Sequence, residues 1–238
     1  MNSLPNATAQ TDDFEFAALR EAKNYRRALL RSFSGYLHGQ VLEVGAGVGQ
    51  NTEMMLRNPA IQKLVSIEPD ARFCHRLRTT HPGHRVIQGT IEDLRDIERW
   101  DAILNVNVLE HIEEDDRELA NYRRLLEPAG GALCLFVPAR PEIYAPIDKD
   151  FGHFRRYTKP ELRRKLERAG FKIAQLRYYN IIGYFGWWLT FGVLGKRRFN
   201  LPAVRLFDRF LFPPVHAIEN HLCAPPFGQS LLAIAVAK

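Results

Sequence analysis

Short apolar runs alternate with helix-patterned stretches along most of the chain. The apolar runs are expected to be strands, and they cover residues 41–44, 63–67, 85–87, 101–106, 132–137, 172–178 and 231–237. Between most of them apolar residues recur three and four positions apart, as in DDRELANYRRLLEP, a spacing typical of amphipathic helices. Continuous apolar strands separated by helices predict an α/β fold with a mainly parallel sheet that is covered on both faces.

Two segments lie outside this alternation. Residues 12–38 indicate an N-terminal helical cap, and residues 179–228 form a long insertion, rich in aromatic residues and prolines, before the last strand. The remaining residues, 40–178 and 229–238, are expected to form the core of one domain. Neither extra segment is needed to complete the sheet, so each either covers a functional site or only caps the core.

Composition narrows the function little. The 238 residues are 46% hydrophobic and 25% charged, which fits a globular domain, and the net charge of +6 permits an anionic substrate, an acidic membrane surface or RNA. The chain start has no basic-then-apolar signal pattern. Cys74, Cys134 and Cys223 show neither metal spacing nor a disulfide framework. We therefore expect a cytoplasmic protein and predict no metal site.

The stretch VLEVGAGVGQNT, residues 41–52, indicates a ligand-binding loop. Glycines at 45, 47 and 49 let the backbone approach a ligand closely, but the dinucleotide pattern needs glycine at position 50, which is Gln50. Glu43 just upstream would repel a pyrophosphate, whereas it suits a ligand that carries an ammonium group and a sulfonium. After the next strand, Glu68 in SIEPD could accept hydrogen bonds from two ribose hydroxyls.

Four stretches together carry a family resemblance: VLEVGAGVGQNT, SIEPD, NVNVLEHI and LLEPAGGALCLFVP. In their order and spacing they resemble the motifs of class I S-adenosylmethionine-dependent methyltransferases. The chain is most similar to the small-molecule branch (methyltransferase types 11 and 12) that includes the ubiquinone-biosynthesis enzymes. The resemblance implies a Rossmann-like, seven-stranded, mostly parallel sheet with an antiparallel last strand. It also implies S-adenosylmethionine as cofactor and S-adenosylhomocysteine as product.

The resemblance assigns cofactor contacts by position. Glu43 would hold the methionine ammonium group, Glu68 the ribose, and Thr90 would frame the adenine, although many relatives carry an acid at that position. The full set that the resemblance implies is Glu43, Gly45, Ala46, Gly47, Gly49, Asn51, Thr52, Glu68, Pro69, Thr90, Ile91, Glu92, Asn105, Val106 and Asn107.

The sequence says less about the molecule that accepts the methyl group. After the fourth strand there is neither the Asn/Asp-Pro-Pro-Tyr signature of amide and adenine N-methylation nor the Pro-Cys of cytosine C5 chemistry. Both absences weaken a nucleic-acid substrate, although the basic stretches FRRYTKPELRRKLERAG and GKRRF keep RNA open. In-line positioning alone can supply about 7–11 kcal/mol of the barrier, so a dedicated base is not compulsory.

The stretch that follows the fifth strand, PARPEIYAPIDKDFGHFRRYTKP, carries the candidates for acting on an acceptor. It resembles a subgroup of bacterial small-molecule methyltransferases. His153 is the first candidate for a general base, since histidine titrates near neutral pH. The alternative is that it only pins the loop to the sheet. Further catalytic candidates are Tyr157 in this stretch and His111 after the fourth strand. Candidates for orienting the substrate are Tyr144, Asp148 and Arg155 in the stretch, and Tyr25 and Trp187 elsewhere in the chain.

The insertion contains an 18-residue stretch without charge, YYNIIGYFGWWLTFGVLG, residues 178–195. Its four glycines and its mid-run tryptophans argue against a membrane span. Three interpretations stay open: the wall of an apolar substrate pocket, a homodimer interface, or peripheral membrane contact through residues 181–198, whose basic end is Lys196 to Arg198.

The sequence therefore favours an enzyme that methylates a small, partly apolar metabolite, with a hydroxyl or carboxylate oxygen as the preferred acceptor. N- or C-methylation of a small or lipid-linked molecule, an RNA methyltransferase and a non-catalytic cofactor-binding module are the alternatives.

Overall fold

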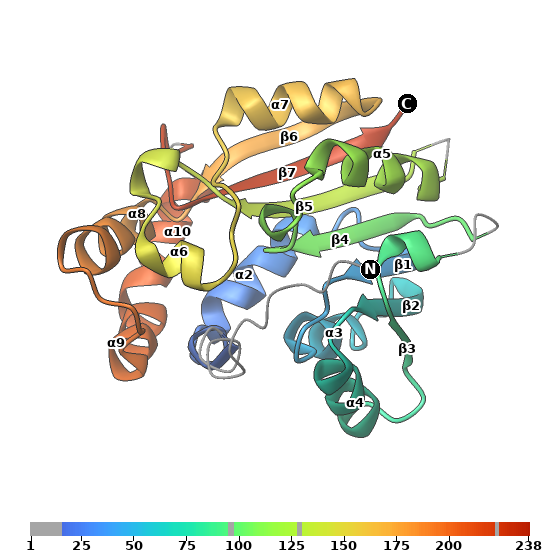
Figure 1. Ribbon diagram of the computed structural model, residues 1–238, viewed down its shortest axis with the longest axis horizontal. Helices are drawn as coiled ribbons and strands as arrows, with labels where there is room; N and C mark the ends of the chain where they lie inside the picture. The colour runs from blue at the N-terminus through green and yellow to red at the C-terminus, as the bar shows by residue number, and fades with distance from the viewer. Residues whose placement is uncertain (1–15, 95–97, 128–129, 222–223) are drawn as a thin grey trace.

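A computed structural model describes residues 16–94, 98–127, 130–221 and 224–238. One seven-stranded sheet has the order β3-β2-β1-β4-β5-β7-β6, and only β7 runs antiparallel to its neighbours. The strands are β1 (Gly39–Val44), β2 (Ile61–Glu68), β3 (Arg85–Gln88), β4 (Ala102–Val106), β5 (Ala132–Pro138), β6 (Phe171–Tyr179) and β7 (Ser230–Ala237). The predicted fold class and all seven predicted strands are confirmed (Figure 1).

Helices cover both faces of the sheet. On one face the buried core joins the strands to α5 (Asp115–Leu125) and α7 (Lys159–Arg168), and on the other to α2 (Lys23–Phe33), α3 (Gln50–Met55) and α10 (Phe212–His221). Successive residues of a strand point to opposite faces. Val41 and Leu42 are both fully buried, one in each core, which explains the continuous apolar runs in the sequence.

The order of the strands reverses at β1. The chain passes from β1 outward to β2 and β3, and then returns to β4 on the other side of β1. In open α/β sheets the crevice for a ligand lies at such a reversal, beyond the carboxyl ends of the strands. In Figure 1 the arrowheads of β4 and β5 point toward the side where α6 (Pro146–Asp150), α8 (Ile181–Trp187) and α9 (Leu201–Leu206) gather.

The insertion is helical. Helix α8 continues into a π-helical turn over Trp188–Val193, and α9 continues through a second π-helical turn, Phe207–Leu211, into α10. Among the described residues, no helix combines the length and apolarity that a bilayer crossing requires. Helix α4 (Ala71–Thr80) follows β2.

Two buried acids of the insertion cap helices: Asp208 joins the insertion to α2, and Glu219 joins two helices within the insertion. The Asp208 carboxylate accepts hydrogen bonds from the backbone N–H groups of Asn24 (2.9 Å) and Tyr25 (2.8 Å) in the first turn of α2. The Glu219 carboxylate accepts from the N–H groups at the start of α8, Asn180 and Ile181. Each acid satisfies helix N-terminal donors that have no partner within their own helix.

The N-terminal segment and the cysteines add two local facts. Residues 16–21 are helical and precede α2, whereas residues 12–15 of the predicted cap lie outside the described residues. Cys74 and Cys134 are buried free thiols, and Cys223 lies outside the described residues.

Candidate active site

A first cavity, of about 490 Å³, lies at the reversal point of the sheet. That volume falls in the usual range of small-molecule and cofactor sites. Most of the predicted glycine loop and the ends of β2 and β4 line this cavity. The predicted residues that line it are Tyr25, Gly45, Ala46, Gly47, Asn51, Glu68, Pro69, Val106, Asn107 and His111.

Glycine is required in the loop that follows β1. Gly45 and Gly47 have φ angles of 69° and 53°, in the left-handed region that side-chain-bearing residues rarely adopt. A Cβ atom on Gly47 would also lie 2.6 Å from Cε1 of Phe16, and both residues line the first cavity. The glycines thus let the loop turn sharply and leave room for both the N-terminal cap and a ligand.

Glu68 is anchored by backbone donors and faces the first cavity. Its Oε2 accepts a hydrogen bond from the N–H of Gly47 (2.8 Å), and its Oε1 accepts from the N–H of Asp70 (3.0 Å). Each carboxylate oxygen can accept more than one hydrogen bond. The pair of oxygens is therefore held in place and can still accept from two adjacent hydroxyls, as a ribose offers.

Glu43 lies behind the glycine loop and not on the cavity wall. Its Oε2 accepts hydrogen bonds from the hydroxyls of Thr52 and Ser66. Burial raises the pKa of Glu43 to about 7, although the hydrogen bonds from Ser66 and Thr52 oppose the shift. In this conformation Glu43 and Thr52 support the loop from below, and direct contact with a ligand ammonium group stays a prediction.

Five further predicted cofactor residues do not line the first cavity. Gly49 packs against Leu77, and Ile91 is buried in the core. Thr90 begins a 3₁₀ turn and its N–H donates to Asp93. Glu92 forms an exposed ion pair with Arg117, and the amide of the buried Asn105 donates to Tyr122. Contacts of these five positions with the cofactor stay predictions.

A second cavity, of about 180 Å³, adjoins the first. The two share the lining residues Leu19, Tyr25, Asn107 and Phe151. The wall of the second cavity is mainly apolar and comes from the N-terminal helices and the insertion, with polar groups at one end. Those polar groups are Glu110, His153, Arg156, Asn180, Gln229 and Ser230.

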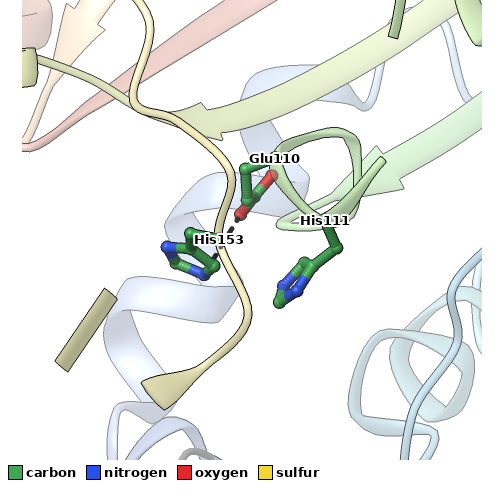
Figure 2. A group of neighbouring side chains, drawn as sticks. All are labelled: Glu110, His111 and His153. Atoms are coloured by element: carbon green, nitrogen blue, oxygen red, sulfur yellow. Dashed lines mark ion pairs between the residues drawn. The ribbon is translucent and has the colours of Figure 1, made fainter. Parts of the chain in front are cut away.

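Glu110, His111 and His153 meet where the two cavities adjoin. Figure 2 shows the Glu110 carboxylate directed toward the His153 ring, with His111 beside them. The distance from His153 Nε2 to Glu110 Oε1 is 4.0 Å, and the two imidazole rings are 4.7 Å apart in an edge-to-face arrangement. His111 lines the first cavity, whereas Glu110 and His153 line the second.

Asp148 orients the His153 ring. Its Oδ1 lies 3.0 Å from His153 Nδ1 and also accepts from the Arg156 guanidinium at 2.8 Å. Burial alone would raise the pKa of Asp148, but the hydrogen bond from His153 and the charge of Arg156 outweigh it, and the pKa is lowered. An ionised carboxylate only accepts hydrogen bonds, so Nδ1 of His153 is the donor to Asp148, and whenever the ring is neutral Nε2 has the lone pair.

The same group of side chains could hold a metal ion. One ligand atom from each of Glu110, His111 and His153 lies within 4.8 Å of the others. His111 would be a neutral ligand, because burial and the nearby His153 lower its pKa to about 3. Acid–base chemistry and metal binding both use His153 Nε2, so an experiment must separate them.

Three residues of the 144–157 loop lie elsewhere than the sequence predicts. Tyr157 is fully buried in the core, and its hydroxyl donates to Asp115 (2.9 Å). Arg155 pairs with Asp115 and donates to a backbone carbonyl, and the Tyr144 hydroxyl donates to the carbonyl of His153 (2.7 Å). None of the three lines either cavity, and their contact with an acceptor stays a prediction.

Tyr25 and Trp187, which the sequence predicts to orient the substrate, do line the cavities. Tyr25 faces both cavities, and burial raises the pKa of its hydroxyl above the ordinary value. Trp187 lines the second cavity with the Arg156 guanidinium 4.4 Å from its ring centre. Sequence reasoning missed the lining residues Phe16 and Phe151. No local signal distinguishes them from core aromatics, because the fold alone brings them to the cavities.

Residues 16–176 match a family model described as a methyltransferase domain. The chain belongs to this methyltransferase family. A search of the curated proteins gives no match.

Solved structures show the same fold at low sequence identity. A Bacillus halodurans protein described as a candidate methyltransferase is 19% identical, with a TM-score of 0.61 over 89% of this chain and 98% of that one. An S-adenosylmethionine-dependent methyltransferase from Mesorhizobium loti is 15% identical (TM-score 0.58; 84% and 92% covered). The N-methyltransferase NodS from Bradyrhizobium japonicum, solved with S-adenosylhomocysteine, is 18% identical (TM-score 0.57; 90% and 86% covered). The predicted class I methyltransferase fold is confirmed.

Proposed function

We propose that this methyltransferase binds S-adenosylmethionine in the first cavity and methylates a hydroxyl or carboxylate oxygen of a small acceptor in the second. The adjoining of the two cavities at the Glu110–His111–His153 group carries the proposal. The bound cofactor supplies an electrophilic methyl group on sulfur. Glu68 accepts hydrogen bonds from its ribose, and the glycine loop lies against it.

For a hydroxyl acceptor, His153 is the proposed base. The acceptor oxygen forms the new C–O bond as the methyl–sulfur bond breaks, and the hydroxyl proton passes to His153 Nε2. Asp148 on Nδ1 and the Glu110 carboxylate beyond Nε2 both favour the imidazolium that forms. Asp148 thus acts as a positioning residue.

The second cavity favours a small, partly apolar acceptor over RNA. Its volume is about 180 Å³, and Trp187, Phe199 and Phe207 line its apolar side. A carboxylate on the acceptor would have the buried Arg156 as a neighbour. Free buried thiols at Cys74 and Cys134 suit a reducing compartment, and the cytoplasm is the proposed location.

A turnover assay tests the acceptor chemistry. S-Adenosylhomocysteine release is followed with a panel of aromatic and alkyl alcohols, matched to their methyl ethers and to the corresponding amines. We expect alcohols to stimulate release and to gain one methyl group on oxygen by mass spectrometry, with the ethers inert. Stimulation by amines alone would overturn O-methylation. Turnover that persists in EDTA removes the metal alternative, whereas loss in EDTA and recovery with a divalent metal assigns His153 as a ligand.

A further inference from the structure

The outer surface of the insertion carries exposed apolar side chains beside basic ones. In α8 and the π-helical turn after it, Phe185, Trp188 and Leu189 are spaced to share one helix face and are about half exposed. Leu206 and Phe210, four residues apart, form a second exposed pair. Several large, exposed apolar side chains in one segment of the chain indicate contact with another molecule.

Every exposed charge on residues 181–220 is positive. The basic residues are Lys196, Arg197, Arg198, Arg205 and Arg209, and all are exposed. The only acids in this range, Asp208 and Glu219, are buried, where they cap α2 and α8. No exposed acid within this range therefore balances these positive charges.

Two of these arginines also fasten the insertion to other elements. Arg197 pairs with Asp150 at the end of α6, and Arg205 pairs with Glu21. Within the part of the chain that the structure describes, no ion pair involves Lys196, Arg198 or Arg209. These three cations are therefore the ones placed to meet an anionic partner.

The same helices separate the second cavity from the outside. Val204 and Phe207 line that cavity, while Leu206 and Phe210 in the same helical run are 60% and 57% exposed. Trp187 lines it as well, and the adjacent Trp188 is 48% exposed. The insertion is thus apolar on the side of the acceptor and apolar with basic residues on the outside. It also lies beyond residue 176, where the family match ends.

We propose that the outer surface of the insertion docks on an anionic phospholipid bilayer and that the acceptor is an amphiphile that resides there. The part of this inference that concerns the acceptor rests on the proposed function, whereas the docking does not. Apolar side chains enter the headgroup region while basic side chains meet lipid phosphates. A second copy of the chain fits less well, because a two-fold interface through this surface would bring the same positive charges together.

Vesicle co-sedimentation with the full chain tests the docking. We expect binding to vesicles of phosphatidylglycerol and phosphatidylcholine, little binding to pure phosphatidylcholine, and weakening by salt. Lys196→Gln with Arg198→Gln should lower the partition constant about 25-fold, roughly fivefold for each charge. Trp188→Ser with Phe210→Ser should lower it at least about tenfold. The matched control is Leu56→Ser, an apolar residue 45% exposed outside the insertion, which should bind as wild type does.

Two results would overturn the docking. One is equal sedimentation of wild type and the Trp188→Ser/Phe210→Ser variant with anionic vesicles. The other is a wild-type dimer, by analytical ultracentrifugation, that the double variant converts to monomer while neither protein binds vesicles. S-Adenosylhomocysteine affinity and turnover of a water-soluble alcohol are measured on the same proteins. Both should be unchanged by these substitutions. Failed docking with intact turnover leaves the proposed function standing. Intact docking without turnover removes the proposed function and the proposed acceptor but leaves the docking.

Discussion

The two cavities differ in what holds their shape. The shape of the first cavity depends mainly on the backbone, through the left-handed turns at Gly45 and Gly47 and the N–H groups that anchor Glu68. The shape of the second depends on side chains: Asp148 fixes His153 and Arg156, and Asp208 joins the insertion to α2. A backbone loop can accept one cofactor in many proteins, whereas a side-chain network can be rebuilt for each acceptor. We therefore expect the first cavity to hold the cofactor and the second to select the acceptor.

Replacement of His153 is expected to give the largest difference between the effect on turnover and the effect on cofactor affinity. His153→Ala should lower turnover about 100- to 10,000-fold, the usual range for loss of a general base. It should leave the Kd of S-adenosylhomocysteine within about twofold of wild type, measured by calorimetry. His75→Ala, on the exposed surface of α4, is the control and should change neither quantity. Equal turnover in wild type and His153→Ala would remove the proposed base.

Glu68 is expected to show the opposite pattern. Glu68→Ala removes a charged acceptor of two ribose hydroxyls and releases the N–H groups of Gly47 and Asp70, so cofactor affinity should fall about 100-fold or more. Glu68→Gln should lose less. The informative control is Glu92→Ala: the resemblance assigns Glu92 to the cofactor, but the structure places it in an exposed ion pair. Unchanged calorimetric affinity in Glu68→Ala would contradict the ribose assignment.

The pH dependence of the free energy of unfolding should report on Glu43, which lies behind the glycine loop. Its pKa of about 7 in the fold exceeds the ordinary 4.5, so folding favours the protonated carboxyl. The stability from this group is full below pH 4.5 and is lost as the pH rises through about 7. Between pH 4 and pH 8, cofactor-free wild type should lose about 3 kcal/mol relative to Glu43→Gln. Urea unfolding at both pH values measures this difference, and parallel pH profiles would show that Glu43 is not buried as described.

The smallest effect is expected where the insertion joins α2. Asp208→Ala leaves the N–H groups of Asn24 and Tyr25 without their acceptor and should lower the free energy of unfolding by about 1 kcal/mol. Because Tyr25 lines both cavities, the KM of the acceptor should also rise. Asp116→Ala, at an exposed acid of α5, is the matched control. An unchanged melting temperature in Asp208→Ala would show that the insertion is held by other contacts.

The sequence predicts the first cavity better than the second for a physical reason. A glycine that must adopt a positive φ angle leaves a local trace, so Gly45 and Gly47 are found by pattern alone. Strand-end residues such as Glu68 and Asn107 follow from the strand order. Tyr157 and Arg155, in contrast, have residue types that suit a site, but the sequence does not show their long-range contact with Asp115.

Residues that gain a role by tertiary contact are the hardest to predict. Glu110 and His153 are 43 positions apart in sequence, yet Nε2 and Oε1 lie 4.0 Å apart. Phe16 and Phe151 reach the first cavity from segments that read as ordinary helix and loop. In the insertion, the uncharged stretch and its basic end are visible in sequence, but the contacts of Asp208 with α2 and of Glu219 with the start of α8 appear only in the structure.

Calorimetric titration of the full chain with S-adenosylmethionine tests the central claim most directly. One molecule should bind per chain with a Kd in the micromolar range, about 1 μM to 1 mM as for enzyme substrates generally, and S-adenosylhomocysteine should compete for the same site. No heat of binding at millimolar cofactor, with the chain shown to be folded by circular dichroism, would contradict the assignment of the first cavity.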